Sequence, residues 1–120
     1  MPVSRIDVRK VADITIAICS DKRLNDDFVI QEWGDQLIAL VEEQKTKKLL
    51  VNFERVEFMS SSALRALITL SKKAKIEQTT LFLCGIHENI MEAFRITKLD
   101  TVFSIKKSED EAIRTFTFLS

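Results

Sequence analysis

The chain alternates apolar runs of strand length with longer segments whose apolar residues recur at helical spacing. The strand-like runs lie at residues 6–9, 13–19, 47–53, 79–85 and 101–106. Apolar residues repeat every three or four positions in segments 28–43, 64–76 and 86–97, and again from Ala112 onward. This order predicts an α/β fold whose first two strands are antiparallel and whose later strands are parallel. We expect a mixed four- or five-stranded sheet with its helices mainly on one face.

Composition limits both the number of domains and the class of partner. A chain of 120 residues suits one domain, so we expect residues 1–120 to form a single domain. Two glycines and one proline are too few for a chain of many tight hairpins. The 18 basic residues are balanced by 18 acidic ones. The broad positive surface of a nucleic-acid-binding protein is therefore absent, and we expect no nucleic-acid partner.

The residues that commonly hold metals or form disulfides give no site pattern. Cys19 and Cys84 lie inside apolar runs, which is typical of small buried side chains, and no CxxC spacing occurs. His87 is the only histidine. We therefore expect no metal and no cofactor. No apolar stretch approaches the roughly 18 residues of a membrane span, and the N-terminus lacks a signal-peptide core. These features favour a soluble cytoplasmic protein without membrane insertion.

Three consecutive serines, Ser60, Ser61 and Ser62, stand where the strand-like segment gives way to a helical one, in the stretch "EFMSSSALRAL". One interpretation is a serine-rich helix cap, because serine hydroxyls accept hydrogen bonds from the free N–H groups of a first helical turn. The other is a chemical target held at the start of a helix. Local chemistry leaves both open. A serine nucleophile needs a base, and neither a G-x-S-x-G elbow nor a glycine-rich phosphate loop is present. We expect no catalytic residue and no enzyme.

Two segments resemble the STAS domain family, the fold of bacterial anti-anti-sigma factors. The first is "LLVNFERVEFMSSSALRALITLSKKA", in which "FMSSSAL" occupies the place of the family's D-S-S-G-L-like turn. The second is "MEAFRITKLDTVFSI", which matches the spacing of a later helix and strand of the family. The resemblance extends along nearly the whole chain. It implies a STAS-like domain that regulates transcription by binding another protein.

The resemblance also implies a phosphorylation site. In anti-anti-sigma factors, a partner that is both anti-sigma factor and serine kinase phosphorylates the first serine after the aspartate. By position, Ser61 matches that serine, with Ser60 and Ser62 as the alternatives. Ser60 replaces the family's aspartate, and Ala63 replaces its glycine. The implied partners are an anti-sigma factor that is also a serine protein kinase and, in addition, a serine phosphatase.

We expect the partner to contact the turn formed by Met59, Ser60, Ser61, Ser62 and Ala63. In this prediction Met59 is exposed and adaptable, whereas Phe58 packs inward at the end of a strand. The polar segment 21–27 is expected at the same edge of the sheet, as a second contact. An alternative function is a non-phosphorylated STAS-like subunit of a transport or signalling assembly.

Overall fold

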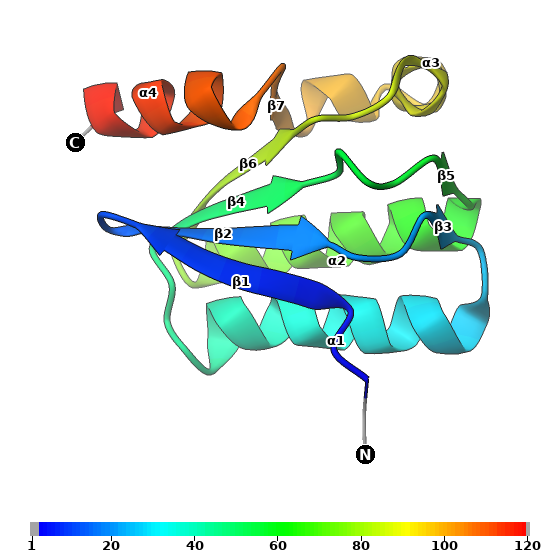
Figure 1. Ribbon diagram of the computed structural model, residues 1–120, viewed down its shortest axis with the longest axis horizontal. Coiled ribbons are helices and arrows are strands. Elements are labelled where there is room, and N and C mark those ends of the chain that lie inside the picture. The colour runs from blue at the N-terminus through cyan, green and yellow to red at the C-terminus, as the bar shows by residue number, and fades with distance from the viewer. Residues whose placement is uncertain (1–2, 120) are drawn as a thin grey trace.

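The computed structural model describes residues 3–119, and it contains the predicted mixed sheet of five strands. The strand order is β1-β2-β4-β6-β7. β1 (Ile6–Val11) is antiparallel to β2 (Ile14–Cys19), while β4 (Lys48–Asn52), β6 (Thr80–Cys84) and β7 (Ser104–Lys106) continue the sheet in parallel. The prediction of an antiparallel start followed by a parallel portion is confirmed (Figure 1).

Four α-helices and one short 3₁₀ helix connect or follow these strands. They are α1 (Asp27–Glu42), α2 (Ser61–Ile76), α3 (Glu88–Ile96), η1 (Leu99–Thr101) and α4 (Glu109–Leu119). Side chains cap the starts of two of these helices. The Asp26 carboxylate accepts the N–H of Val29 at 3.1 Å, and the Ser108 hydroxyl accepts the N–H of Glu111 at 3.2 Å.

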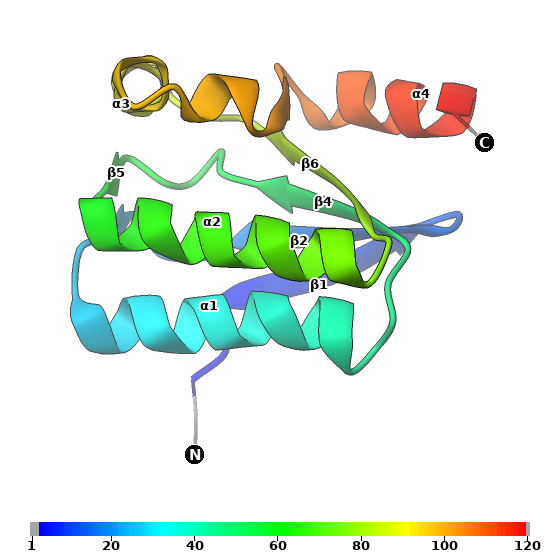
Figure 2. The same cartoon turned by 180° about the vertical axis from the view of Figure 1, so that it is seen from behind.

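The sheet separates two apolar clusters of unequal size. The larger contains buried residues of α1, α2 and α3, and Figure 2 shows α1 and α2 side by side across one face of the sheet. The smaller lies beneath α4, where the rings of Phe82 and Phe116 stack with centroids 4.1 Å apart. Helices therefore lie mainly on one face, as predicted.

The two cysteines are buried, as predicted, and their thiols are unreactive. Burial raises the pKa of the Cys19 thiol to about 12, and it does the same to the pKa of the Cys84 thiol. The indole N–H of Trp33 donates to Cys19 Sγ at 3.3 Å. Both side chains are therefore neutral thiols in the apolar core at physiological pH.

One strand is shorter than its sequence pattern predicts. The apolar residues of segment 101–106 suggested a continuous strand, but the chain forms η1 first and β7 begins only at Ser104. Lys98, before η1, has a positive φ of 60°, which turns the chain sharply after α3. Phe103 consequently precedes the strand and is buried in the larger cluster, together with Leu99 of η1.

Candidate functional site

A second, very small sheet holds the serine turn. β3 (Arg23–Leu24) and β5 (Phe58–Met59) pair in parallel beyond the carboxyl ends of β2 and β4 (Figure 1). The backbone N–H of Glu57 donates to the carbonyl of Lys22 at 2.7 Å, and that of Ser60 donates to the carbonyl of Leu24 at 2.9 Å. This pairing places segment 21–27 beside the serines, as expected from the sequence.

The link between β4 and β5 is held from the other side by the start of α3. A ring nitrogen of His87 lies 2.9 Å from the carbonyl oxygen of Glu54. The amide of Asn89 donates to the carbonyl of Glu57 at 3.0 Å. The chain entering α2 is thus fixed by hydrogen bonds from both β3 and α3, so the turn has a defined shape.

The three serines have three different surroundings. Ser60 has extended backbone dihedral angles and is the N-cap of α2: its hydroxyl accepts the N–H of Ala63 at 3.4 Å, and its carbonyl accepts that of Leu64 at 3.1 Å. The Ser62 hydroxyl accepts a hydrogen bond from the Arg65 guanidinium at 3.1 Å. Ser61, the first helical residue, is exposed, and its hydroxyl has no hydrogen-bond partner among residues 3–119. The cap and the candidate target are therefore different residues.

The predicted orientations of Phe58 and Met59 are wrong. Met59 is 8% exposed and belongs to the larger core cluster, whereas Phe58 is 37% exposed and lies beneath the guanidinium of Arg23, 4.7 Å from its ring centroid. The pairing of β5 with β3 decides which side chain faces the core, because successive residues of a strand point to opposite sides. Ala63 is also fully buried. The partner-binding role of the five-residue turn stays a prediction, with the serines as its accessible side chains.

A family model describes most of this chain. The model of the STAS domain matches residues 26–112, a span that contains the turn, β4, β6 and the first three helices. This chain belongs to the STAS domain family. The match confirms the resemblance seen in the two sequence segments.

A curated protein is similar to part of this STAS domain. The "Putative anti-sigma factor antagonist BtrV" of Bordetella bronchiseptica is 25% identical over 70 residues, which are 58% of this chain. The match covers only 60% of that protein's own length.

Solved structures share the fold. An anti-sigma-factor antagonist (STAS) domain protein from Planctomyces limnophilus superposes with a TM-score of 0.80 at 24% identity, over 92% of this chain and 95% of that one. The Bacillus cell fate determinant SpoIIAA in its phosphorylated form superposes with a TM-score of 0.70 at 16% identity, over 92% of this chain and 98% of that one. At these identities the likeness concerns the fold alone.

The turn of this STAS domain lacks the geometry of a nucleophilic site. Within residues 3–119, none of the three serine hydroxyls is hydrogen-bonded to a histidine or a carboxylate. His87 instead faces the backbone of Glu54. A serine needs such a base to act as a nucleophile.

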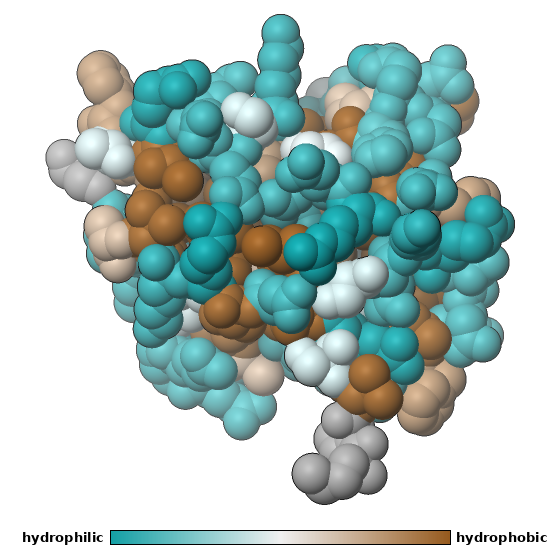
Figure 3. Space-filling view, viewed as in Figure 1, coloured by the Kyte–Doolittle hydropathy of each residue, from teal (hydrophilic) through white to brown (hydrophobic). Residues whose placement is uncertain are grey.

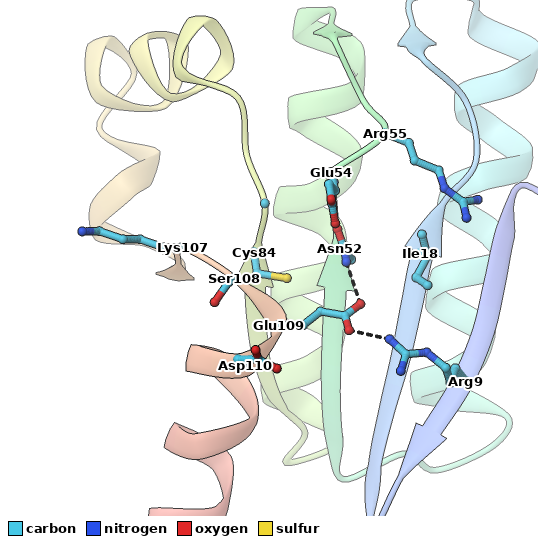
Figure 4. Close-up of a pocket in the computed structure, with 11 residues that line it drawn as sticks. Arg9, Ile18, Asn52, Glu54, Arg55, Cys84, Lys107, Ser108, Glu109 and Asp110 are labelled. Carbon is cyan, nitrogen blue, oxygen red and sulfur yellow. Dashed lines mark hydrogen bonds and ion pairs between the residues drawn. The ribbon is translucent and has the colours of Figure 1, made fainter.

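A polar hollow not predicted from the sequence lies on the face of the sheet covered by α4, opposite to α1 and α2. It has a volume of about 850 Å³ and lies between the start of α4 and the ends of β4 and β6 (Figure 4). The carboxylate of Glu109 accepts a hydrogen bond from the buried Asn52 amide at 2.7 Å, and it forms an ion pair with Arg9. Gly85 has a φ of +71°, and a Cβ there would lie 3.0 Å from Asn52 Oδ1. An asparagine at the end of the apolar run "LLVN" was the available signal.

The charge of Glu109 is stabilised despite partial burial. Burial opposes ionisation, but the hydrogen bonds from Arg9 and Asn52 outweigh it and hold the pKa of Glu109 below its usual value. At this hollow, the contacts among Arg9, Asn52 and Glu109 therefore connect α4 to β1 and β4. These three lining residues already bond one another, which favours a structural role for this network.

Within residues 3–119, no group of three or more histidine, cysteine or acidic residues is placed to hold a metal ion. No helix in that part of the chain is long and apolar enough to cross a membrane. On the face seen in Figure 3, apolar side chains form separate patches between hydrophilic ones.

Proposed function

We propose that this STAS domain is a regulatory binding domain of the anti-anti-sigma type, switched by phosphorylation of Ser61. Its partner is an anti-sigma factor that is also a serine protein kinase, and a serine phosphatase reverses the modification. The proposal places the protein in the bacterial cytoplasm, without nucleic-acid binding or membrane insertion. The names of the similar proteins support the antagonist role. That SpoIIAA is known in a phosphorylated form supports the chemistry.

The observation that carries the proposal is the state of Ser61. It is exposed at the first position of α2, and its hydroxyl makes no hydrogen bond within residues 3–119. Phosphorylation therefore breaks no contact that stabilises the fold. Ser60 is engaged as the cap and Ser62 with Arg65, so a kinase reaches Ser61 at the lowest local cost.

The transfer step is a displacement at the γ-phosphorus of a nucleoside triphosphate held by the partner. The Ser61 oxygen forms a bond to that phosphorus, the bond to the bridging oxygen breaks, and the nucleoside diphosphate leaves. The hydroxyl proton passes to a base of the kinase. This chain supplies the hydroxyl and its position, and the kinase supplies the catalytic groups.

The modification changes binding without unfolding the domain. A phosphate adds about −1.5 to −2 charges, and the free N–H groups and dipole of a helix start tolerate that charge. A partner packed on the turn meets a crowded and partly desolvated phosphate instead of a hydroxyl, at a cost of a few kcal/mol. A cost of about 3 kcal/mol corresponds to a change in Kd of roughly a hundredfold.

The test is capture of the tagged protein from its native cells, followed by mapping of phosphorylated residues by mass spectrometry. We expect a serine kinase among the captured proteins and phosphate on Ser61. The Ser61→Ala variant retains the partner but carries no phosphate at the turn. Capture of transporter or signalling subunits, with no phosphate on any of the three serines, would instead support the alternative of an unmodified structural subunit.

A further inference from the structure

We propose that Arg65 is the intramolecular partner of a phosphate on Ser61. The inference rests on the proposed function for the presence of the phosphate. Ser61 and Arg65 are four residues apart on α2, a spacing that brings side chains together on one helix face. Helical side chains lean toward the N-terminus, and the Arg65 guanidinium already reaches back to the Ser62 hydroxyl at 3.1 Å. The positive charge is thus one residue away from the proposed phosphate.

The guanidinium of Arg65 is not held by a carboxylate. No acidic oxygen lies within 4.0 Å of it among residues 3–119. Several other arginines of this chain do pair with acidic side chains, namely Arg5, Arg9, Arg55 and Arg95. The described hydrogen bond of the Arg65 guanidinium is to a neutral hydroxyl, which a phosphate readily displaces because charge-assisted bonds are stronger.

Arg65 also lines a groove of about 400 Å³ between α1 and α2, together with Asp27, Asp35 and Ser62. Asp35 accepts a hydrogen bond from the Gln31 amide at 2.9 Å. When Arg65 turns toward the phosphate, its charge leaves this groove and the two aspartates stay. Phosphorylation then alters two adjacent surfaces, the turn and the groove, although only one residue is modified.

An arginine suits this role better than a lysine. Its planar guanidinium presents N–H groups that match two phosphate oxygens at once, whereas an ammonium acts as a point charge. Pairing with Arg65 favours the doubly charged phosphate and fixes its direction along α2. The partner therefore meets an ordered dianion in place of a freely rotating one.

The test uses protein in which phosphoserine is incorporated at position 61 during synthesis, so that no kinase is needed. Titration followed by ³¹P NMR gives the pKa of the second phosphate ionisation. We expect this pKa to be about 0.2–0.4 pH unit higher in Arg65→Ala than in the parent. Arg65→Lys should fall between the two. Lys72→Ala removes an equal charge from an exposed position farther along α2 and should leave the pKa unchanged.

Equal pKa values for the parent and Arg65→Ala would overturn the inference, as would an equal increase in Lys72→Ala. Thermal melts of the unmodified variants confirm that each one folds. Failure of the proposed function looks different: the phosphate would show the Arg65-dependent pKa, but the phosphorylated protein would bind the kinase partner as tightly as the unmodified protein does.

Discussion

Ser60 supplies the two hydrogen bonds that begin α2, through its hydroxyl and its carbonyl oxygen. Ser60→Ala removes only the hydroxyl bond, which is long at 3.4 Å. We expect it to lower the free energy of unfolding by about 0.5–1 kcal/mol, the weaker part of the range for helix caps. Urea denaturation followed by circular dichroism measures the change.

Ser61→Ala is the matched control for that experiment. The Ser61 side chain is exposed and unbonded within residues 3–119, so its loss should change stability by less than about 0.5 kcal/mol. A larger loss for Ser61→Ala than for Ser60→Ala would mean that the assignment of cap and target is reversed.

The position of the serine turn can be predicted from the sequence, but the orientations of the two preceding side chains cannot. The serines follow a strand and precede a helical pattern, which was enough to place them at a helix start. The sequence predicts the orientations of Phe58 and Met59 the wrong way round, because a two-residue strand has no periodicity of its own. Their orientation depends on pairing with Leu24 and Arg23, more than thirty residues earlier in the chain.

At the level of elements, an aromatic contact is a main anchor of α4 on the sheet. Phe116 is fully buried and stacks on Phe82 of β6. Phe116→Ala should lower the free energy of unfolding by about 3–5 kcal/mol, because it leaves a cavity beneath the helix. Phe118→Ala, two residues later, is the control: that side chain is 91% exposed, and its loss should cost less than about 0.5 kcal/mol. Similar losses for the two variants in chemical denaturation would contradict this docking of α4.

The hold of Glu109 on α4 predicts a dependence on pH. The folded pKa of Glu109 lies below its unfolded value of 4.5, so its stabilisation is present above about pH 4.5 and is lost as the pH falls through the folded pKa. Glu109→Gln should therefore be less stable than the parent at pH 7, by about 1 kcal/mol, and the difference should shrink below pH 4.

Asp110→Asn is the control for this titration. It removes a negative charge from the same first turn at an exposed position without touching Arg9 or Asn52. If Glu109→Gln and Asp110→Asn show the same pH profile in thermal melts, the pH-dependent stabilisation comes from the helix dipole and not from the contacts of Glu109 with Arg9 and Asn52.

The elements that were predicted well are those with long periodic patterns. α1 and α2 were recognised from apolar spacing over four turns, and β2, β4 and β6 from runs of apolar residues. β3, β5 and η1 were not recognised, since each has two or three residues and exists because of tertiary contacts. The network around Glu109 was missed for the same reason: Arg9, Asn52 and Glu109 meet only through the order of the strands.

For the whole molecule, the arrangement separates stability from signalling. The sheet and its two apolar clusters hold the fold (Figures 1 and 2), while Ser61, the first residue of α2, belongs to neither cluster. A charge added there meets the start of a helix and the side chain of Arg65, which no carboxylate of residues 3–119 holds, and no core contact is disturbed. The folded state should therefore persist through phosphorylation, while the surface presented to a partner changes.

Ser61→Asp tests how far a charge alone operates the switch. Because the helix start offsets the local cost of a carboxylate, the variant should melt within a few degrees of the parent. Its affinity for the kinase partner should fall, by less than with true phosphate, since one carboxylate carries less charge and fewer oxygens. An affinity equal to that of the parent would argue against a switch based on charge.

The most direct measurement is calorimetric titration of the kinase partner with unmodified protein and with protein phosphorylated only at Ser61. The account predicts that phosphate raises Kd by roughly a hundredfold or more, while the thermal melt of the free domain stays nearly unchanged. Equal Kd values for the two forms, with phosphate on Ser61 verified, would contradict the account and reduce the turn to a serine-rich helix cap.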